Sequence, residues 1–359
     1  MIDRENTTRR DPRRPRRVVI VSLSVIAALG LAACSSSKAS GTGGAASAAP
    51  KSIKVTMGNN STPDMAYLPS EMAVESLAGT YNVKKTIQFA DDTTALQALS
   101  NNTIQFMTES VPPFATAAAK LPNLVAVGTR ANDQWDMVAK SNVSDCTQLG
   151  GKRVGLFSKS GVSTAYVKLY FAKTCPDAKY TTIITPDSAL RRQALEAGQL
   201  DATPLQATDA VQILNGPDKS KFHELANFAT ELPGIGRDLL LTNKQTLKDH
   251  PDVVEAFLKA QVTAIRGFYA NPTTLPSLMA KYLPGSVQPA LASQVADYFV
   301  GHKLFCANGG LSDDSVTQSV KTFGDGGFLP KGTDATKIVD DSAMKKVLAA
   351  IGPSTATTC

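Results

Sequence analysis

The chain has 359 residues, with 37 Lys and Arg against 31 Asp and Glu, and a pI near 9.0. Seven of the basic and three of the acidic residues fall within residues 1–33, so the rest of the chain carries 30 basic and 28 acidic side chains, a net charge of +2. Because the charges after residue 33 nearly balance, the high pI does not indicate nucleic-acid binding, and no nucleic-acid partner is expected. A chain of this length exceeds what one hydrophobic core usually serves, which predicts two lobes.

The first 33 residues are typical of a bacterial export signal. A segment with seven arginines precedes the uncharged run 18–33, which is shorter than the roughly 20 residues that a membrane-spanning helix needs. The run ends in Leu31-Ala32-Ala33-Cys34, which resembles a lipobox, whose cysteine receives a diacylglycerol. We therefore predict a lipoprotein signal peptide over 1–33, lipidation at Cys34 and a flexible Ser-, Ala- and Gly-rich tether over 34–50. The alternative is an uncleaved amphipathic anchor.

Strand and helix patterns alternate after the tether. In the first series, strands are predicted over 53–57, 83–89, 103–107 and 124–127, with helices ending at Leu77, carrying apolar residues over 95–99 and beginning at Val111. Residues 108–110 are predicted to form a turn. Strands that alternate with short helices predict a mostly parallel sheet covered by helices on both faces.

The alternation restarts at Trp135. In this second series, strands are predicted over 135–139, 153–157, 181–184, 200–205 and 238–242, with helices over 164–172, 187–197 and 252–269. The chain is expected to stay helical to about residue 300. Beyond that point we predict a loop-rich tail with one short helix over 340–351.

Four cysteines follow Cys34, an even number that is compatible with two disulfides in an oxidising compartment. The disulfide candidates are Cys146, Cys175, Cys306 and Cys359. Three pairings are possible, and pairing of sequence neighbours is favoured because it keeps each bridge within one lobe. No CxxC motif occurs and the three histidines are scattered, so neither a metal site nor a cofactor is predicted.

Three segments resemble the type II periplasmic binding proteins for aliphatic sulfonates, taurine, nitrate or pyrimidine thiamine precursors. They are Thr94-Ala95-Leu96-Gln97-Ala98-Leu99 with Ile104-Gln105-Phe106, which resembles the pattern ALxxGxIDF; Leu149-Gly150-Gly151-Lys152-Arg153-Val154-Gly155, which resembles LKGKKVG; and Leu195-Glu196-Ala197-Gly198-Gln199-Leu200-Asp201-Ala202, which resembles xxxGxIDA. Their order and spacing, with the long helix after Pro251, extend the resemblance over about residues 51–283.

The resemblance implies a two-lobed α/β fold in which each lobe is a mostly parallel sheet flanked by helices. Two hinge crossings join the lobes, and the ligand is held between them. The crossings are expected near 128–135 and 233–238. The expected division is 52–128 with 239–300 for lobe 1, 135–232 for lobe 2, and 301–359 for a C-terminal extension packed on the lobes.

Ligands of open parallel sheets lie beyond the carboxyl ends of the strands, so four loops are predicted to face the cleft. The candidate ligand-binding residues are Asn59, Asn60, Ser61, Thr108, Glu109, Ser110, Ser158, Lys159, Ser160, Gly161, Ser163, Gln206, Thr208 and, at the second crossing, Arg237. The loop 158–163 opens a helix, whose free N–H groups and dipole suit a sulfonate, carboxylate or phosphate. Ordinary N-capping by Ser160 or Ser163 is the alternative.

Glu109 argues against a simple anionic ligand. Its carboxylate repels an anion unless it pairs with Lys159, with Arg237 or with an amino group on the ligand, and a solvated position on the rim is the alternative.

Arg130 and Arg237, at the two crossings, have the bidentate geometry to clamp an anion. They are equally suited to pair with nearby acids such as Asp133 or Asp238. Trp135 is the single tryptophan, and packing at the hinge is favoured for it over stacking on a planar ligand.

These features predict a substrate-binding lipoprotein of an ABC-type importer, monomeric and anchored outside the cytoplasm. It would deliver a small polar, sulfonate- or nitrate-like ligand to a permease and its ATPase. The alternatives are an extracytoplasmic ligand sensor, a binder of a pyrimidine thiamine precursor, or an enzyme on the same fold. Residues 161–165 approach a nucleophile elbow but lack its final glycine and a placed histidine, which argues against the enzyme.

Overall fold

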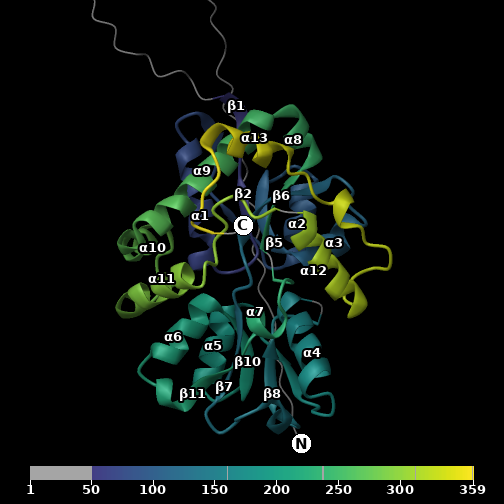
Figure 1. Cartoon of the computed structure of the whole chain (residues 1–359), viewed down its shortest axis with the longest axis vertical. Helices are drawn as coiled ribbons and strands as arrows, with labels where there is room; N and C mark the ends of the chain where they lie inside the picture. The colour runs from purple at the N-terminus through teal and green to yellow at the C-terminus, as the bar shows by residue number, and fades with distance from the viewer. Residues whose placement is uncertain (1–50, 160, 237, 312, 358) are drawn as a thin grey trace, which may run out of the picture. The chain divides into compact units, whose positions relative to one another are not determined.

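The computed structural model describes residues 51–359 except 160, 237, 312 and 358. The predicted signal peptide, Cys34 and the tether therefore lie outside the described residues, as do Ser160 and Arg237. The described chain forms two five-stranded sheets with helices packed around them (Figure 1). Within it, no helix combines the length and apolar character needed to cross a bilayer.

The first sheet occupies the upper half of the view in Figure 1 and has the strand order β4-β2-β5-β12-β6. Its strands are β2 (Met57–Asn59), β4 (Ile87–Gln88), β5 (Phe106–Ser110), β6 (Leu124–Ala131) and β12 (Asp238–Asn243). The helices of this half are α1 (Leu68–Leu77), α2 (Asp92–Ser100), α3 (Val111–Ala118), α8 (Lys244–Asp249), α9 (Pro251–Ala270), α10 (Leu275–Tyr282), α11 (Ala292–Gly301) and α13 (Ser342–Ile351). A separate parallel pair joins β1 (Lys51–Val55) to β3 (Tyr81–Val83).

The second sheet has the order β11-β7-β10-β8-β9. Its strands are β7 (Trp135–Lys140), β8 (Arg153–Leu156), β9 (Thr181–Ile184), β10 (Ala202–Gln206) and β11 (Phe222–Asn227). Helices α4 (Val162–Thr174), α5 (Ser188–Glu196), α6 (Ala207–Asn215) and α7 (Phe228–Glu231) accompany it.

The chain crosses between the sheets twice, from β6 to β7 and from α7 back to β12. In each sheet, the strand that enters from the other sheet runs against its neighbours: β7 is antiparallel to β10 and β11, and β12 is antiparallel to β5 and β6. The other described pairs in both sheets are parallel. The predicted fold class, mostly parallel sheets flanked by helices, is therefore confirmed.

Several predicted boundaries were wrong. The strand predicted over 103–107 is β5 at 106–110, because the N–H groups of Thr103 and Ile104 still bond to the carbonyl of Ala98 at the end of α2. Residues 108–110 therefore end a strand and are not a turn. The strand predicted over 83–89 is divided into β3 and β4.

Five of the described strands and α-helices had no prediction: β11, α6, α7, α8 and the tail helix α12 (Asp313–Asp325). Strand β11 lies at an edge of its sheet, where its burial does not follow a strict alternation. The expected loop-rich tail is wrong over α12, whose sequence is largely polar and Ser/Thr-rich.

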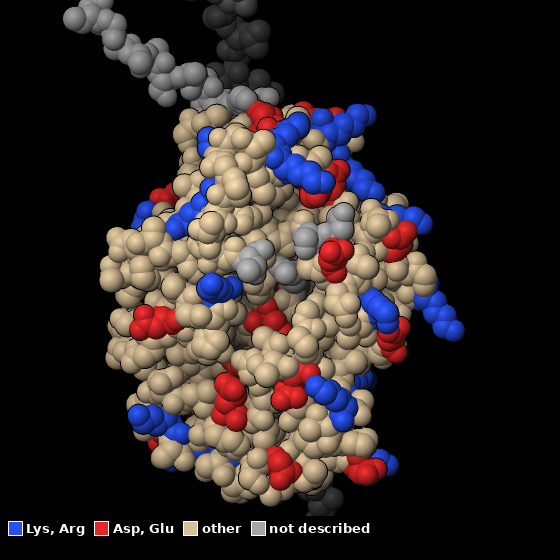
Figure 2. Space-filling model, viewed as in Figure 1, with Lys and Arg blue, Asp and Glu red and all other residues tan. Residues whose placement is uncertain are grey.

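Buried apolar side chains hold the sheets to their helices. The ring centroids of Phe106 on β5 and Phe257 on α9 lie 4.3 Å apart, and both side chains are fully buried. Disulfides join Cys146 to Cys175 and Cys306 to Cys359, the pairing of sequence neighbours. On the face shown in Figure 2, basic and acidic side chains are interspersed, as the near-balanced charge implies.

Helix α12 contacts parts of both halves. Phe323, which is fully buried, packs at 5.9 Å between ring centroids against Tyr166 on α4 of the second half. On the same helix, the Ser319 hydroxyl donates to the carbonyl of Ile235 (3.1 Å), in the segment that returns to β12. The helix also packs on α3 of the first half. The tail is thus part of the core.

Replacing Phe323 tests this packing. We expect Phe323→Ala to lower the free energy of unfolding by about 3–5 kcal/mol, because it leaves a cavity against Tyr166. The matched control is Lys321→Ala on the exposed face of α12, for which a change within about 0.5 kcal/mol is expected. Urea unfolding of both variants measures the difference, and equal stabilities would show that α12 does not pack as described.

Candidate functional site

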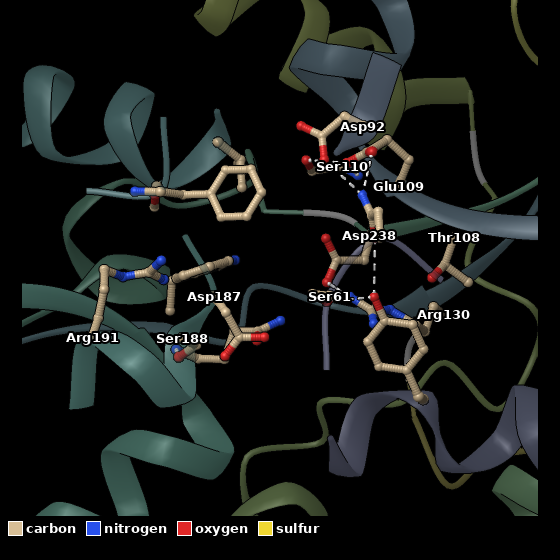
Figure 3. Close-up of a pocket in the computed structure, with 17 residues that line it drawn as sticks. Ser61, Asp92, Thr108, Glu109, Ser110, Arg130, Asp187, Ser188, Arg191 and Asp238 are labelled. Carbon is tan, nitrogen blue, oxygen red and sulfur yellow. Dashed lines mark hydrogen bonds and ion pairs between the residues drawn. The ribbon is translucent and has the colours of Figure 1, made fainter. Parts of the chain in front are cut away.

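A cavity of about 60 Å³ lies between the two sheets, at the carboxyl ends of β5 and β10 and at the two crossings. Its described lining consists of Asn60, Ser61, Tyr67, Asp92, Thr108, Glu109, Ser110, Arg130, Trp135, Phe157, Val162, Ser163, Asp187, Ser188, Arg191, Gln206 and Asp238. This volume is the space open to the centre of a water-sized sphere. One water molecule needs about 10–15 Å³ of such space, so the cavity has room for about four to six water-sized groups. Figure 3 shows these side chains converging from both sheets.

Half of the predicted ligand-binding residues line this cavity. They are Asn60, Ser61, Thr108, Glu109, Ser110, Ser163 and Gln206. These residues come from the loop after β2, the end of β5, the start of α4 and the end of β10. The rule that ligands lie beyond the carboxyl ends of parallel strands therefore located seven of the seventeen described lining residues.

The other predicted residues that the structure describes are outside the lining. The Asn59 amide donates to Glu71 (2.9 Å), and the Thr208 hydroxyl accepts from the N–H of Met65 (3.3 Å). In the loop before α4, Lys159 is exposed and Ser158 Oγ accepts from the N–H of Gly161 (2.8 Å). The hydroxyl of Ser158 therefore supports the turn before α4. The helix begins after Gly161 without a side-chain cap, so the alternative of capping by Ser163 is wrong, and Ser160 lies outside the described residues.

Arg130, at the end of β6, is buried at the junction of the two crossings. It forms an ion pair with Asp238 at the start of β12, and its guanidinium lies 4.0 Å from the centroid of the Tyr67 ring. Burial opposes the charge, but Asp238, Tyr67 and Asp64 together hold the pKa of Arg130 above its usual value. The Nε and Nη1 atoms have no hydrogen-bond partner among the residues that the structure describes. Of the two functions expected for Arg130, pairing with Asp238 is present and donors remain for a ligand.

Arg191, on α5 of the second half, is a second buried arginine in the wall. Its side chain is fully buried and donates to the carbonyls of Pro204 (3.0 Å) and Thr185 (3.2 Å). Burial lowers the pKa of Arg191 to about 10, so it stays charged at neutral pH. Its Nη2 atom has no hydrogen-bond partner within the described part of the chain.

The sequence carried a signal for Arg191 that our predictions did not use. Ser188, Arg191 and Leu195 recur at helical spacing and form the buried face of α5. An arginine on the buried face of a helix is unusual and needs several acceptors.

Glu109 on β5 and Asp92 at the start of α2 form a pair of carboxyl groups in the part of the wall that the first half contributes. The Asn60 amide donates to both, to Asp92 Oδ1 (2.8 Å) and to Glu109 Oε2 (2.7 Å). The other oxygen of Glu109 accepts from the backbone N–H (2.8 Å) and hydroxyl (3.0 Å) of Ser110. Burial raises the pKa of both carboxyl groups, and for Glu109 the neighbouring Asp92 raises it further. Glu109 is buried, which contradicts the solvated alternative.

Asp187 links the two halves at the mouth of the cavity. Its Oδ1 caps α5 by accepting from Ala189 (2.8 Å), and its Oδ2 accepts from the N–H of Thr62, which follows β2 (2.9 Å). The residue has φ of +72°, a conformation that is uncommon outside glycine. A strained backbone held by bonds to both halves fits a functional position.

The wall therefore presents hydrogen-bond donors that the described part of the chain leaves free. Besides the guanidinium groups, the buried Thr108 hydroxyl has no partner among the described residues. Buried polar groups normally find partners, so free donors from both sheets indicate a ligand with acceptor atoms. Among the described residues, no three His, Cys, Asp or Glu side chains gather in a way that could hold a metal ion.

Two sheets joined by two crossings, with a polar cavity between them, define the periplasmic-binding-protein fold, which solved structures share. The chain belongs to the NMT1/THI5-like family, whose model matches residues 82–274, more than half of its length. No curated protein sequence matches the chain closely enough to serve as a relative.

Three solved structures illustrate the likeness. The alkanesulfonate-binding protein SsuA of Xanthomonas axonopodis pv. citri, bound to MOPS, has a TM-score of 0.63 at 17% identity over 82% of this chain and 99% of its own. The nitrate-binding protein NrtA of Synechocystis PCC 6803 has a TM-score of 0.64 at 11% identity, over 86% and 93%. The desulfurization enzyme DSZB has a TM-score of 0.57 at 11% identity, over 83% and 99%. The predicted resemblance to sulfonate- and nitrate-binding proteins is confirmed.

The pair of Arg130 and Asp238 yields a prediction about stability. We expect Asp238→Ala to cost about 3–5 kcal/mol, because it leaves the buried guanidinium without its counter-ion. The double variant Arg130→Met with Asp238→Ala should be more stable than Asp238→Ala alone, because no uncompensated charge remains. Urea unfolding compares the variants. A double variant that is as unstable as the sum of the two single changes would contradict the ion pair's role.

Proposed function

We propose that this protein is the substrate-binding component of an ABC-type importer that captures a small polar ligand with an anionic group between its two halves. The observation that carries the proposal is the set of free guanidinium N–H groups, from Arg130 on the first half and Arg191 on the second. Charge-assisted bonds from guanidinium to an oxyanion are strong and geometrically selective. A ligand that bonds to both arginines favours the closed arrangement, because it contacts both halves at once.

The division of the chain follows from the same proposal. Residues 52–128 with 239–300 and residues 135–232 act as the two lobes, and the segments around Arg130 and Asp238 act as the hinge. Hydrogen bonds join the halves near the mouth, such as those of Asp187 with Thr62 and of Gln212 on α6 with the carbonyl of Ser286 (3.2 Å). Bonds of this kind are each worth about 1 kcal/mol. The apolar side chains of Ala207 and Val211 on α6 are also buried against the first half, so opening must separate both kinds of contact.

The cavity supports binding over catalysis. Its described lining contains no histidine, cysteine or lysine. The Ser163 hydroxyl accepts from the N–H of Phe157 (3.4 Å), and among the described residues no hydrogen bond joins it to a side chain that could act as its general base. We therefore propose a protein without catalytic activity, although a desulfurization enzyme shares the fold.

The importer role agrees with the predicted export signal and with lipidation at Cys34. A receptor tethered next to its permease meets it at a high effective concentration. The proposal thus places the protein outside the cytoplasm, on the membrane that carries the permease and its ATPase.

A ligand screen tests the proposed function. Protein lacking residues 1–34 should show a rise in melting temperature with at least one member of a panel of sulfonates, nitrate, carboxylates, amino acids and pyrimidines, and no product should form. A ligand at 100 times its dissociation constant stabilises the fold by about 2.7 kcal/mol. The proposal fails if no compound shifts the melting temperature or if the bound compound is turned over.

Arg191→Lys provides a sharper prediction. Lysine keeps the positive charge but loses the planar fork, so we expect the ligand found in that screen to bind at least tenfold more weakly, about 1.4 kcal/mol. The matched control is Arg192→Lys on the same helix, since Arg192 pairs with Glu196 and Asp209 away from the cavity. Isothermal titration calorimetry measures both. Equal affinities for the two variants would move the ligand away from Arg191.

A further inference from the structure

The described wall of the cavity has more carboxyl groups than a site for a simple anion needs. Among the described residues, four carboxyl groups line it, against two guanidinium groups. Asp238 is paired with Arg130, and Asp187 is occupied by backbone N–H groups of two segments. Glu109 and Asp92 have no cation among the described side chains within ion-pair distance.

These two carboxyl groups are held in place. Asn60 bridges them through one amide nitrogen, and Ser110 fixes the remaining oxygen of Glu109 with two bonds. Two carboxyl groups that share a buried site disfavour each other's ionisation. A positively charged N–H donor between them would remove that penalty, whereas a simple anion would add to it.

The arrangement separates the two kinds of group. In Figure 3, Asp92 and Glu109 lie together at the top of the view, while Arg130 and Arg191 lie lower, on opposite sides. The free N–H groups of the arginines can bind an anionic group of a ligand, and the pair of carboxyl groups can bind a cationic group. Because the cavity has room for about four to six water-sized groups, the anionic and the cationic group must belong to one short molecule.

We propose that the ligand is a small zwitterion whose primary ammonium group binds Glu109 and Asp92 and whose carboxylate or sulfonate binds the free guanidinium N–H groups of Arg130 and Arg191. A primary ammonium fits better than a quaternary one, because the facing carboxyl oxygens accept hydrogen bonds. The proposal rests on the proposed function and deepens it by naming the ligand class.

Matched probes test the proposal by calorimetry on protein lacking residues 1–34. The zwitterions are β-alanine and taurine, propionate and ethanesulfonate are the same molecules without the amine, and ethylamine lacks the anionic group. We expect at least one zwitterion to bind with a stoichiometry of one, and both its amine-free partner and ethylamine to bind at least tenfold more weakly. Comparing β-alanine with taurine distinguishes a carboxylate from a sulfonate head.

The outcomes separate this proposal from the proposed function. If an amine-free anion binds as tightly as its zwitterion, or if the zwitterions fail while another compound of the panel binds, the zwitterion proposal is overturned and the binding function stands. If no compound of either set binds, both are overturned.

A variant locates the ammonium. Glu109→Gln should weaken the zwitterion at least tenfold and leave the amine-free anion unchanged or tighter, because it removes negative charge at one end alone. The control is Glu71→Gln, a carboxyl group that accepts from Asn59 outside the cavity and should change neither affinity. An equal loss for both probes would show a structural role for Glu109 and contradict the proposal.

Discussion

The buried ion pair of Arg130 and Asp238 is the interaction on which the rest of the site depends. Arg130 is the next-to-last residue of β6 and Asp238 begins β12, so the pair joins the two crossings where the chain passes between the sheets. Asp238 also accepts from the amide of Gln134 (2.8 Å), between β6 and β7. Two guanidinium nitrogens of Arg130 have no hydrogen-bond partner among the described residues. The junction of the crossings is thereby part of the proposed ligand site.

Under the proposed function, a site divided between two sheets would couple binding to closure. The first sheet contributes Arg130 and the acid pair, and the second contributes Arg191 and Asp187. The free donors lie on both halves, so a ligand that bonds to all of them must contact both halves. A ligand can shift the balance between open and closed forms only by the difference in its affinity for them, and contacts to both halves supply that difference.

Most strands and helices were predictable from the sequence, because apolar periodicity and turn residues are local signals. The positions of the crossings were expected only from the family resemblance, and residues 108–110, which were expected to form a turn, end β5. Arg191 and Asp92 were not identified as cavity residues, because they become neighbours of the site only after α5 and α2 dock on their sheets. Thr208 and Asn59 show the converse: they lie next to correctly predicted residues, but their side chains point to other partners.

The central claim is that the cavity at the crossings is where the ligand binds. Trp135 is the only tryptophan of the chain and lines this cavity, 5.8 Å from its ring centroid to the Arg191 guanidinium. Tryptophan fluorescence therefore reports on the cavity without any label. Titration with a ligand that raises the melting temperature should change this fluorescence in a saturable, one-to-one manner, with the same dissociation constant that calorimetry gives. Binding by calorimetry with no change in Trp135 fluorescence would place the ligand elsewhere and contradict the account.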